Sequence, residues 1–252
     1  MGSRLDAATT GTRLLAAPAS GHRPSLGIVT VLLGGIASPL GWSVQYVEAA
    51  CDAVVSELTS WRQGLGTVTM SPPAPFKEAL KALLPFESPW TRELLAPCGT
   101  WTAYLNNGAG GGDATASAAV VARRMKARHV MAENAPRYGP GHAATQVWVS
   151  GPGGDGPLMS IRTVSVAATD GRWEWYEEGA PLPFEEVERY GAHRKRDRFD
   201  RDLLLRYLDA MGIPAHDDSA YGPGVVVQQH VAWPRRTTSL EQERSALGLP
   251  TR

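Results

Sequence analysis

Histidine and cysteine are the residue types in this chain best suited to metal or nucleophilic chemistry. The six histidines have neither the His-x₃-His nor the Glu-x-x-His spacing of zinc sites; they stand at positions 22, 129, 142, 193, 216 and 230. The nearest approach to a metal cluster is His216-Asp217-Asp218, where we expect a polar turn after a helix. The sequence therefore predicts no metal site and no cofactor.

The two cysteines, Cys51 and Cys98, are too few for a disulfide framework, which favours a reduced, cytoplasmic setting. Cys98 falls in a predicted turn, Pro97-Cys98-Gly99. A cysteine in a turn can act as a nucleophile, but no histidine or aspartate nearby in the sequence identifies a partner, and such partners need be close only in space. We assign no catalytic residue, and whether the chain is an enzyme stays open.

A glycine-rich loop at residues 106–113 precedes a helical pattern, which is where phosphate-binding loops occur. A dinucleotide fingerprint would need glycine at position 113, which is aspartate, and no Gly-Lys-Ser/Thr follows. We therefore predict a flexible loop whose Asp113 caps a helix, with Arg123, Arg124 and Lys126 in the last turn of that helix.

The elements that position side chains are clearest at residues 160–211. Asp170-Gly171 separates two strand-like segments and predicts a type I′ hairpin, since both positions need positive φ angles. The register that follows pairs Thr169 with Arg172, Ala168 with Trp173, Val166 with Trp175 and Val164 with Glu177. One face of this hairpin is apolar and the other polar, which favours an antiparallel sheet.

Arg162 falls on the apolar face of the hairpin, diagonal to Glu177. Because buried charges are rarely left unpaired, two interpretations are open. Either the core ends here with a structural contact between Arg162 and Glu177, or Arg162 anchors a ligand.

A helix is predicted after the hairpin. Asp200 is placed to cap it, leucines recur at three- and four-residue spacing up to Met211, and Gly212 ends it. We expect this leucine stripe to pack on the face that carries Trp173 and Trp175.

Further strands are predicted at 90–95, 100–105, 128–132, 145–149 and 224–233, separated mostly by short turns. Runs of adjacent strands favour an α+β fold, with a mostly antiparallel sheet and two or three helices packed on one face. We expect residues 70–252 to form this single domain.

Residues 1–69 differ in composition from the rest of the chain. They hold four basic and four acidic side chains, whereas residues 70–252 hold 21 of each, and Met70-Ser71-Pro72 resembles a natural N-terminus. The apolar run at 26–40 is too short and too rich in glycine to span a bilayer. We predict a poorly structured extension or an upstream start; an export segment and an ordinary strand with a helix are the alternatives.

The formal net charge of zero argues against a general nucleic-acid binder, and we expect no membrane association. Arginine outnumbers lysine 21 to 4, which is typical of high-GC bacterial coding sequence. Eight tryptophans and segregated charge blocks favour a non-enzymatic protein-interaction module, a regulatory or neutralising partner. The alternative is a small-molecule-binding enzyme whose pocket lies over the sheet and is built by distant residues: Tyr104, Arg162, Glu177 and His142.

Overall fold

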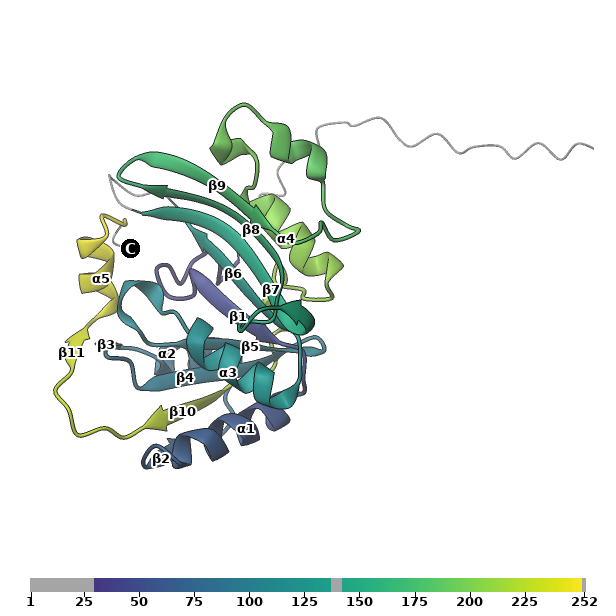
Figure 1. Ribbon diagram of the computed structural model, residues 1–252. Helices are drawn as coiled ribbons and strands as arrows, with labels where there is room; N and C mark the ends of the chain where they lie inside the picture. The colour runs from purple at the N-terminus through teal and green to yellow at the C-terminus, as the bar shows by residue number, and fades with distance from the viewer. Residues whose placement is uncertain (1–29, 137–141, 251–252) are drawn as a thin grey trace, which may run out of the picture.

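The computed structural model describes residues 30–136 and 142–250, which are organised around one nine-stranded antiparallel sheet (Figure 1). The strand order is β2-β10-β4-β5-β1-β6-β7-β8-β9. In chain order these strands are β1 (Ser43–Val47), β2 (Val68–Met70), β4 (Arg92–Cys98), β5 (Trp101–Asn106), β6 (His129–Ala135), β7 (Ala143–Asp155), β8 (Ser160–Thr169), β9 (Arg172–Glu178) and β10 (Val225–Gln229). A separate two-stranded sheet pairs β3 (Phe86–Ser88) with β11 (Arg236–Thr238).

Helices lie on both faces of the large sheet. They are α1 (Cys51–Gln63), α2 (Phe76–Ala82), α3 (Thr115–Met125), α4 (Arg201–Ala210) and α5 (Leu240–Ala246), with short 3₁₀ turns η1 (Ala109–Gly111), η2 (Val187–Gly191), η3 (Lys195–Asp197) and η4 (Asp218–Ala220). The apolar residues of α2 and α4 join a core cluster with Val44, Val147 and Val164, which defines the α4 face of the sheet. Those of α1 and α3 join a second cluster with Val47 and Tyr104, which defines the α1/α3 face.

The predicted hairpin is confirmed in every pair. Thr169 pairs with Arg172 and Val166 with Trp175, while Asp170 and Gly171 have φ angles of 52° and 78°. The side chains of Trp173 and Trp175 pack against the cluster that contains the α4 leucines. Alternation along each strand therefore leaves the opposite side of the hairpin on the α1/α3 face.

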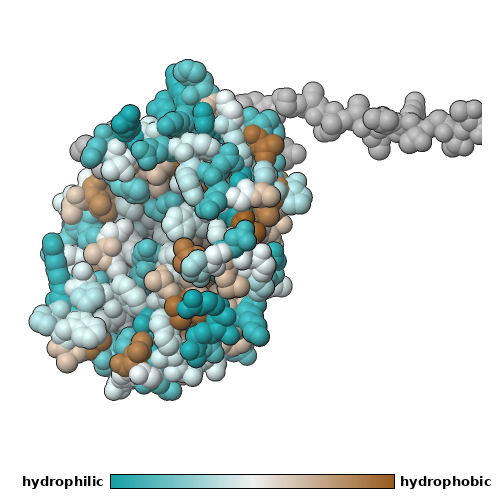
Figure 2. Space-filling view, in the orientation of Figure 1, coloured by the Kyte–Doolittle hydropathy of each residue, from teal (hydrophilic) through white to brown (hydrophobic). Residues whose placement is uncertain are grey.

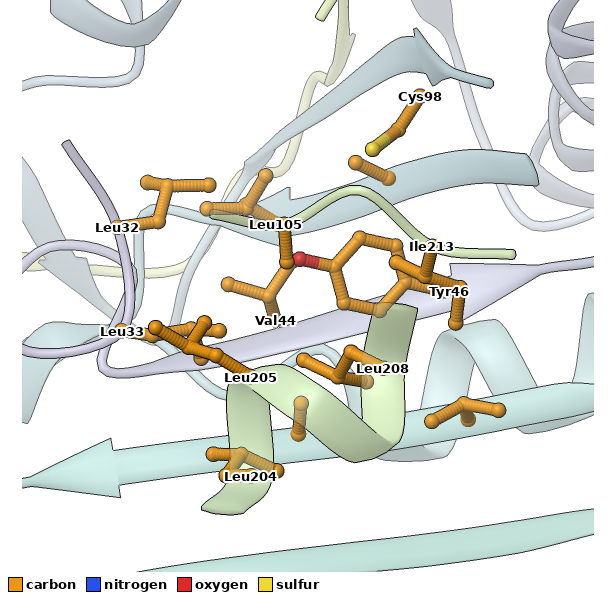
Figure 3. Packing of buried hydrophobic residues seen from close by; sticks show 14 of the residues in the cluster. Leu32, Leu33, Val44, Tyr46, Cys98, Leu105, Leu204, Leu205, Leu208 and Ile213 are labelled. Carbon is orange, nitrogen blue, oxygen red and sulfur yellow. The ribbon is translucent and has the colours of Figure 1, made fainter. Parts of the chain in front are cut away.

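The predicted helix after the hairpin is also confirmed, as α4. The backbone N–H of Leu203 donates to the Asp200 side chain at 2.8 Å, and Gly212 follows the helix with a φ of 80°. Figure 3 shows Leu205 and Leu208 of α4 beside Val44 and Tyr46 of β1, and Leu204 belongs to the same buried cluster. The leucine stripe thus closes the core over the middle strands of the sheet.

The α+β class and the antiparallel sheet are confirmed, but the predicted number and placement of helices are wrong. The described residues contain five helices rather than two or three, and they do not share one face. The reason is physical: strands β1, β4, β5 and β10 have apolar side chains on both faces, so each face needs a cover.

The predicted boundary at residue 70 is contradicted within the described residues, whereas residues 1–29 lie outside them. β1 lies inside the sheet, where it pairs with β5 and β6, and Val44, Tyr46 and Val47 are fully buried. Residues 30–47 carry no charged side chain and are mostly buried, so burial in the domain core explains this part of the low charge. No helix in the described ranges is long and apolar enough to cross a membrane.

Arg162 is held inside the edge of the core. Its guanidinium contacts Glu177 at 2.9 Å, as predicted, and also Glu185 at 2.8 Å, while the Tyr190 hydroxyl donates to Glu185. The side chains of Arg162 and Glu185 are each 2% exposed, whereas that of Glu177 is 41% exposed. Loss of the buried Arg162–Glu185 pair should therefore cost more stability than loss of the contact between Arg162 and the exposed Glu177.

Replacing Arg162 by methionine should lower the free energy of unfolding by about 3–5 kcal/mol, because it leaves Glu185 charged and buried without a partner. Urea denaturation of the two proteins measures this loss. Adding Glu185→Gln to that variant should recover much of it, whereas Glu177→Gln alone should cost less than about 1 kcal/mol. Equal losses for Arg162→Met and Glu177→Gln would contradict the assignment.

Candidate functional site

On the α1/α3 face, the cluster of apolar side chains under α1 and α3 contains no residue of β6–β9 among the described residues. Nine strands about 4.8 Å apart make a sheet about 38 Å wide, whereas two packed helices span about 20 Å. Helices α1 and α3 cover β1, β4, β5 and β10, and the side chains of β6–β9 on the same side form what we call the open face. The open face consists of Met131, Glu133, Gln146, Trp148, Thr163, Ser165, Arg172, Glu174, Tyr176 and Glu178. Met131, Thr163 and Ser165 are buried among their neighbours, and the exposed side chains lie mainly on β7 and β9.

Register arranges the open face in rows across the strands. One row runs Met131, Trp148, Thr163, Glu178, and the next runs Glu133, Gln146, Ser165, Tyr176. Trp148 is 41% exposed and Tyr176 is 54% exposed. Two aromatic rings therefore stand in neighbouring rows of an uncovered sheet.

Within the second row, the polar side chains form a hydrogen-bonded chain. The Ser165 hydroxyl donates to Gln146 Oε1 at 3.0 Å, and the Gln146 amide nitrogen donates to Glu133 Oε2. Ser165 thereby fixes which end of the Gln146 amide faces Glu133. The arrangement suits an ionised Glu133, which accepts and does not donate.

A cleft of about 830 Å³ opens where β6 and β7 meet η1 and the end of α5. Its lining includes the side chains of Trp42, Asp113, Glu133, His142, Gln146 and Trp148. The α5 wall is fixed by Arg244, which donates to the carbonyls of Ser38 at 2.7 Å and Ile36 at 2.8 Å. The cleft thus joins the C-terminal segment to the open face.

Glu133 is the titratable group at the centre of the cleft. Burial raises the pKa of its carboxyl above the ordinary value of 4.5, and the charge of Asp113 raises it further, while Gln146 and His142 act in the opposite direction. His142 Nε2 lies 3.7 Å from Glu133 Oε1. A nearby cation would therefore stabilise the ionised form of Glu133.

The structure does not bring the four predicted site residues together. Arg162 and Glu177 meet on the α4 face, where bonds to Glu185 and Glu177 outweigh burial and raise the pKa of Arg162. Tyr104 is buried under α1 and α3, where its hydroxyl donates to Glu93. His142 alone reaches the cleft.

Sequence reasoning missed Glu133, Gln146 and Trp148. Alternation already predicts that Met131 shares a face with Glu133 and that Gln146 shares one with Trp148. A single sequence does not show that β6 and β7 pair so that Glu133 lies beside Gln146. It also does not show that residues 245–248 line the same cleft.

Cys51, Cys98 and His129 have pKa values shifted away from neutral pH. Burial raises the pKa of Cys98 to about 12 and that of Cys51 to about 11, so both thiols stay protonated. Burial lowers the pKa of His129 to about 4, so its ring is neutral. In the ranges 30–136 and 142–250, no three His, Cys, Asp or Glu side chains are grouped to hold a metal ion.

No protein-family model, curated protein or solved structure matches this chain. We therefore infer its function from the geometry of the open face and the cleft.

Replacing Glu133 by glutamine should remove a pH-dependent cost to folding. Because the pKa in the folded state lies above that of the unfolded chain, ionising Glu133 costs stability; the penalty is absent well below pH 4.5 and complete above the raised pKa. The melting temperature of the variant, relative to the unaltered chain, should therefore rise from pH 4 to pH 8. Differential scanning fluorimetry across this range measures the difference.

Glu188→Gln provides the control, because Glu188 is an exposed acid far from the cleft in the sequence. Its substitution should leave the melting temperature unchanged at each pH. If the melting temperature of Glu133→Gln, relative to that of the unaltered chain, falls as the pH rises, the charge of Glu133 is stabilised within the free protein.

Proposed function

We propose that this chain is a non-enzymatic protein-interaction module, a regulatory or neutralising partner, that binds its target through the open face. The observation that carries this proposal is the pair of exposed rings, Trp148 and Tyr176, on one face of β7 and β9, outside the cluster that packs under α1 and α3.

Aromatic residues support a protein partner because Trp and Tyr are enriched among residues that dominate binding energy. The other large apolar side chains exposed in the described ranges belong to separate segments; they are Ile36, Leu65, Met70, Leu158, Val187 and Trp233. Figure 2 shows hydrophobic residues on the visible surface in small separate groups among hydrophilic ones. Trp148 and Tyr176, in contrast, lie on one continuous face with a common orientation.

Charge on the open face indicates the character of the partner. Glu133, Glu174 and Glu178 lie on it, and Arg172 is the basic residue at its hairpin end. Electrostatic complementarity raises association rates and selects partners, so a basic surface fits this face. The same acidic character disfavours nucleic acid as a target.

The protonated thiols and the neutral His129 support a binding role over catalysis. Two free cysteines, one buried and one half-buried, fit a reduced, cytoplasmic setting, which we include in the proposal.

A small-molecule-binding enzyme is the second candidate function. The cleft of about 830 Å³ favours it, because cavities of this size hold ligands and because Glu133 has a raised pKa. Tyr104, Arg162 and Glu177 lie away from this cleft. A metabolite that raised the melting temperature only when Glu133 is present would favour this candidate.

A photo-crosslinking amino acid at position 176 should capture one defined protein in cells that express the full chain natively. Tyr176 is 54% exposed on β9, the edge strand of the open face, so a partner bound to this face should lie within reach of it. Mass spectrometry identifies the captured protein, and titration of the purified pair gives the dissociation constant. Trp148→Ala should weaken binding by at least about tenfold, roughly 1.4 kcal/mol, as expected for an aromatic anchor.

Trp233 provides the matched control, since it is 56% exposed and lies outside the open face. A crosslinker at position 233 should not capture the same protein, and Trp233→Ala should bind as the unaltered chain does. Equal capture at positions 176 and 233, or equal affinity of the two alanine variants, would refute binding through the open face.

A further inference from the structure

Glu133 differs from the other buried glutamates of the described chain in its partners. Glu93, Glu185 and Glu87, whose side chains are 1%, 2% and 6% exposed, lie 2.8 Å, 2.8 Å and 3.4 Å from the guanidinium groups of Arg62, Arg162 and Arg92, in that order. The side chain of Glu133 is 19% exposed, and no Lys or Arg of the described ranges lies within salt-bridge distance of it. These three buried acids are each paired with arginine, whereas the partly buried Glu133, which opens into the cleft, is not paired with an arginine of the described ranges.

The described residues that line the cleft include more acidic than basic side chains. Asp113 adds a second carboxyl group, and His142 is the only basic side chain among the lining residues, none of which is Lys or Arg. The volume of about 830 Å³ leaves room for a long side chain to enter. Among the described lining residues, a cation that entered the cleft would meet two carboxyl groups and one histidine.

An aromatic surface stands next to the acid. Met131 pairs with Trp148 and Glu133 pairs with Gln146, so Trp148 is the diagonal neighbour of Glu133 on the same face. Diagonal neighbours in an antiparallel pair lie about 7–8 Å apart, within reach of one planar cation. A guanidinium is able to lie over the ring of Trp148 while its N–H groups point to Glu133.

We propose that the cleft binds an arginine side chain of the partner protein, between the carboxylate of Glu133 and the ring of Trp148. This inference rests on the proposed function and adds the chemistry that the partner must present. Gln146, oriented by Ser165, donates to Glu133 Oε2, whereas the only charged or titratable neighbour of Oε1 among the described residues is His142, with its Nε2 at 3.7 Å, so the guanidinium would bond to Oε1. Arginine fits better than lysine because its guanidinium is planar and donates in a fork.

The first test uses N-acetyl-L-argininamide as the probe and its neutral isostere, N-acetyl-L-citrullinamide, as the control. The full chain is labelled with 5-fluorotryptophan at its eight tryptophans, and Trp148→Phe identifies the fluorine resonance of Trp148. The argininamide should shift that resonance with a millimolar dissociation constant, and the citrullinamide should bind at least about tenfold more weakly. Glu133→Gln should weaken argininamide binding by a similar factor, whereas Glu188→Gln should leave it unchanged.

Equal shifts with the two probes, or unchanged binding by Glu133→Gln, would overturn the assignment of a cation site. The second test adds argininamide to the crosslinking reaction at position 176 and should reduce capture of the partner. Binding of the probe without competition would place a free cation in the cleft and overturn the claim that the partner supplies it. If crosslinking at position 176 succeeds while the probe fails, the proposed function stands and this inference alone is wrong.

Discussion

A nine-stranded antiparallel sheet has two wide faces, and the number and placement of the helices decide which parts of those faces are exposed to solvent. On the α4 face, α2, α4 and the segments around them bury a continuous set of apolar side chains. On the other face, the apolar side chains of α1 and α3 pack with those of β1, β4, β5 and β10. The side chains of β7–β9 on that second face are correspondingly polar or aromatic, and Figure 1 shows these strands curving away from the two helices.

Buried charge follows a second regularity that links stability to binding. Arginine neutralises Glu93 beneath α1 and Glu185 beside α4, and each pair ties a strand to a neighbouring segment. Glu133 lies in an equally structured setting, bonded through Gln146 to Ser165, but without such a partner. An acid whose pKa is raised by burial and whose diagonal neighbour is the exposed ring of Trp148 fits the binding surface that we propose.

Local chemistry made the hairpin and α4 predictable. Asp170-Gly171 fixes the turn, and the turn fixes the register of both strands, so Trp173 and Trp175 could be assigned to the core from a few residues. Asp200 and Gly212 mark the ends of α4 in the same local way. The contact of Arg162 with Glu177 followed from that register, while its stronger partner, Glu185, lies beyond the hairpin.

Long-range pairing could not be predicted in this way. β1 pairs with β5 and β6, more than fifty residues away, and the low charge that made residues 30–69 resemble an appendage is the mark of a central strand. The cleft likewise needs β6, β7, η1 and the end of α5 together. Tyr104, Arg162 and His142 were proposed to surround one pocket, but side-chain alternation and burial place them in three separate environments.

Hydroxyl-radical footprinting of the free chain at a concentration where it is monomeric tests the central claim most directly. If the open face is accessible to solvent in the free chain, Trp148 and Tyr176 should be oxidised at rates typical of exposed rings. Trp101 and Tyr46, which are 2% and 0% exposed, should be protected. Protection of Trp148 and Tyr176 as strong as that of Trp101 would show that something covers this face and would contradict the account.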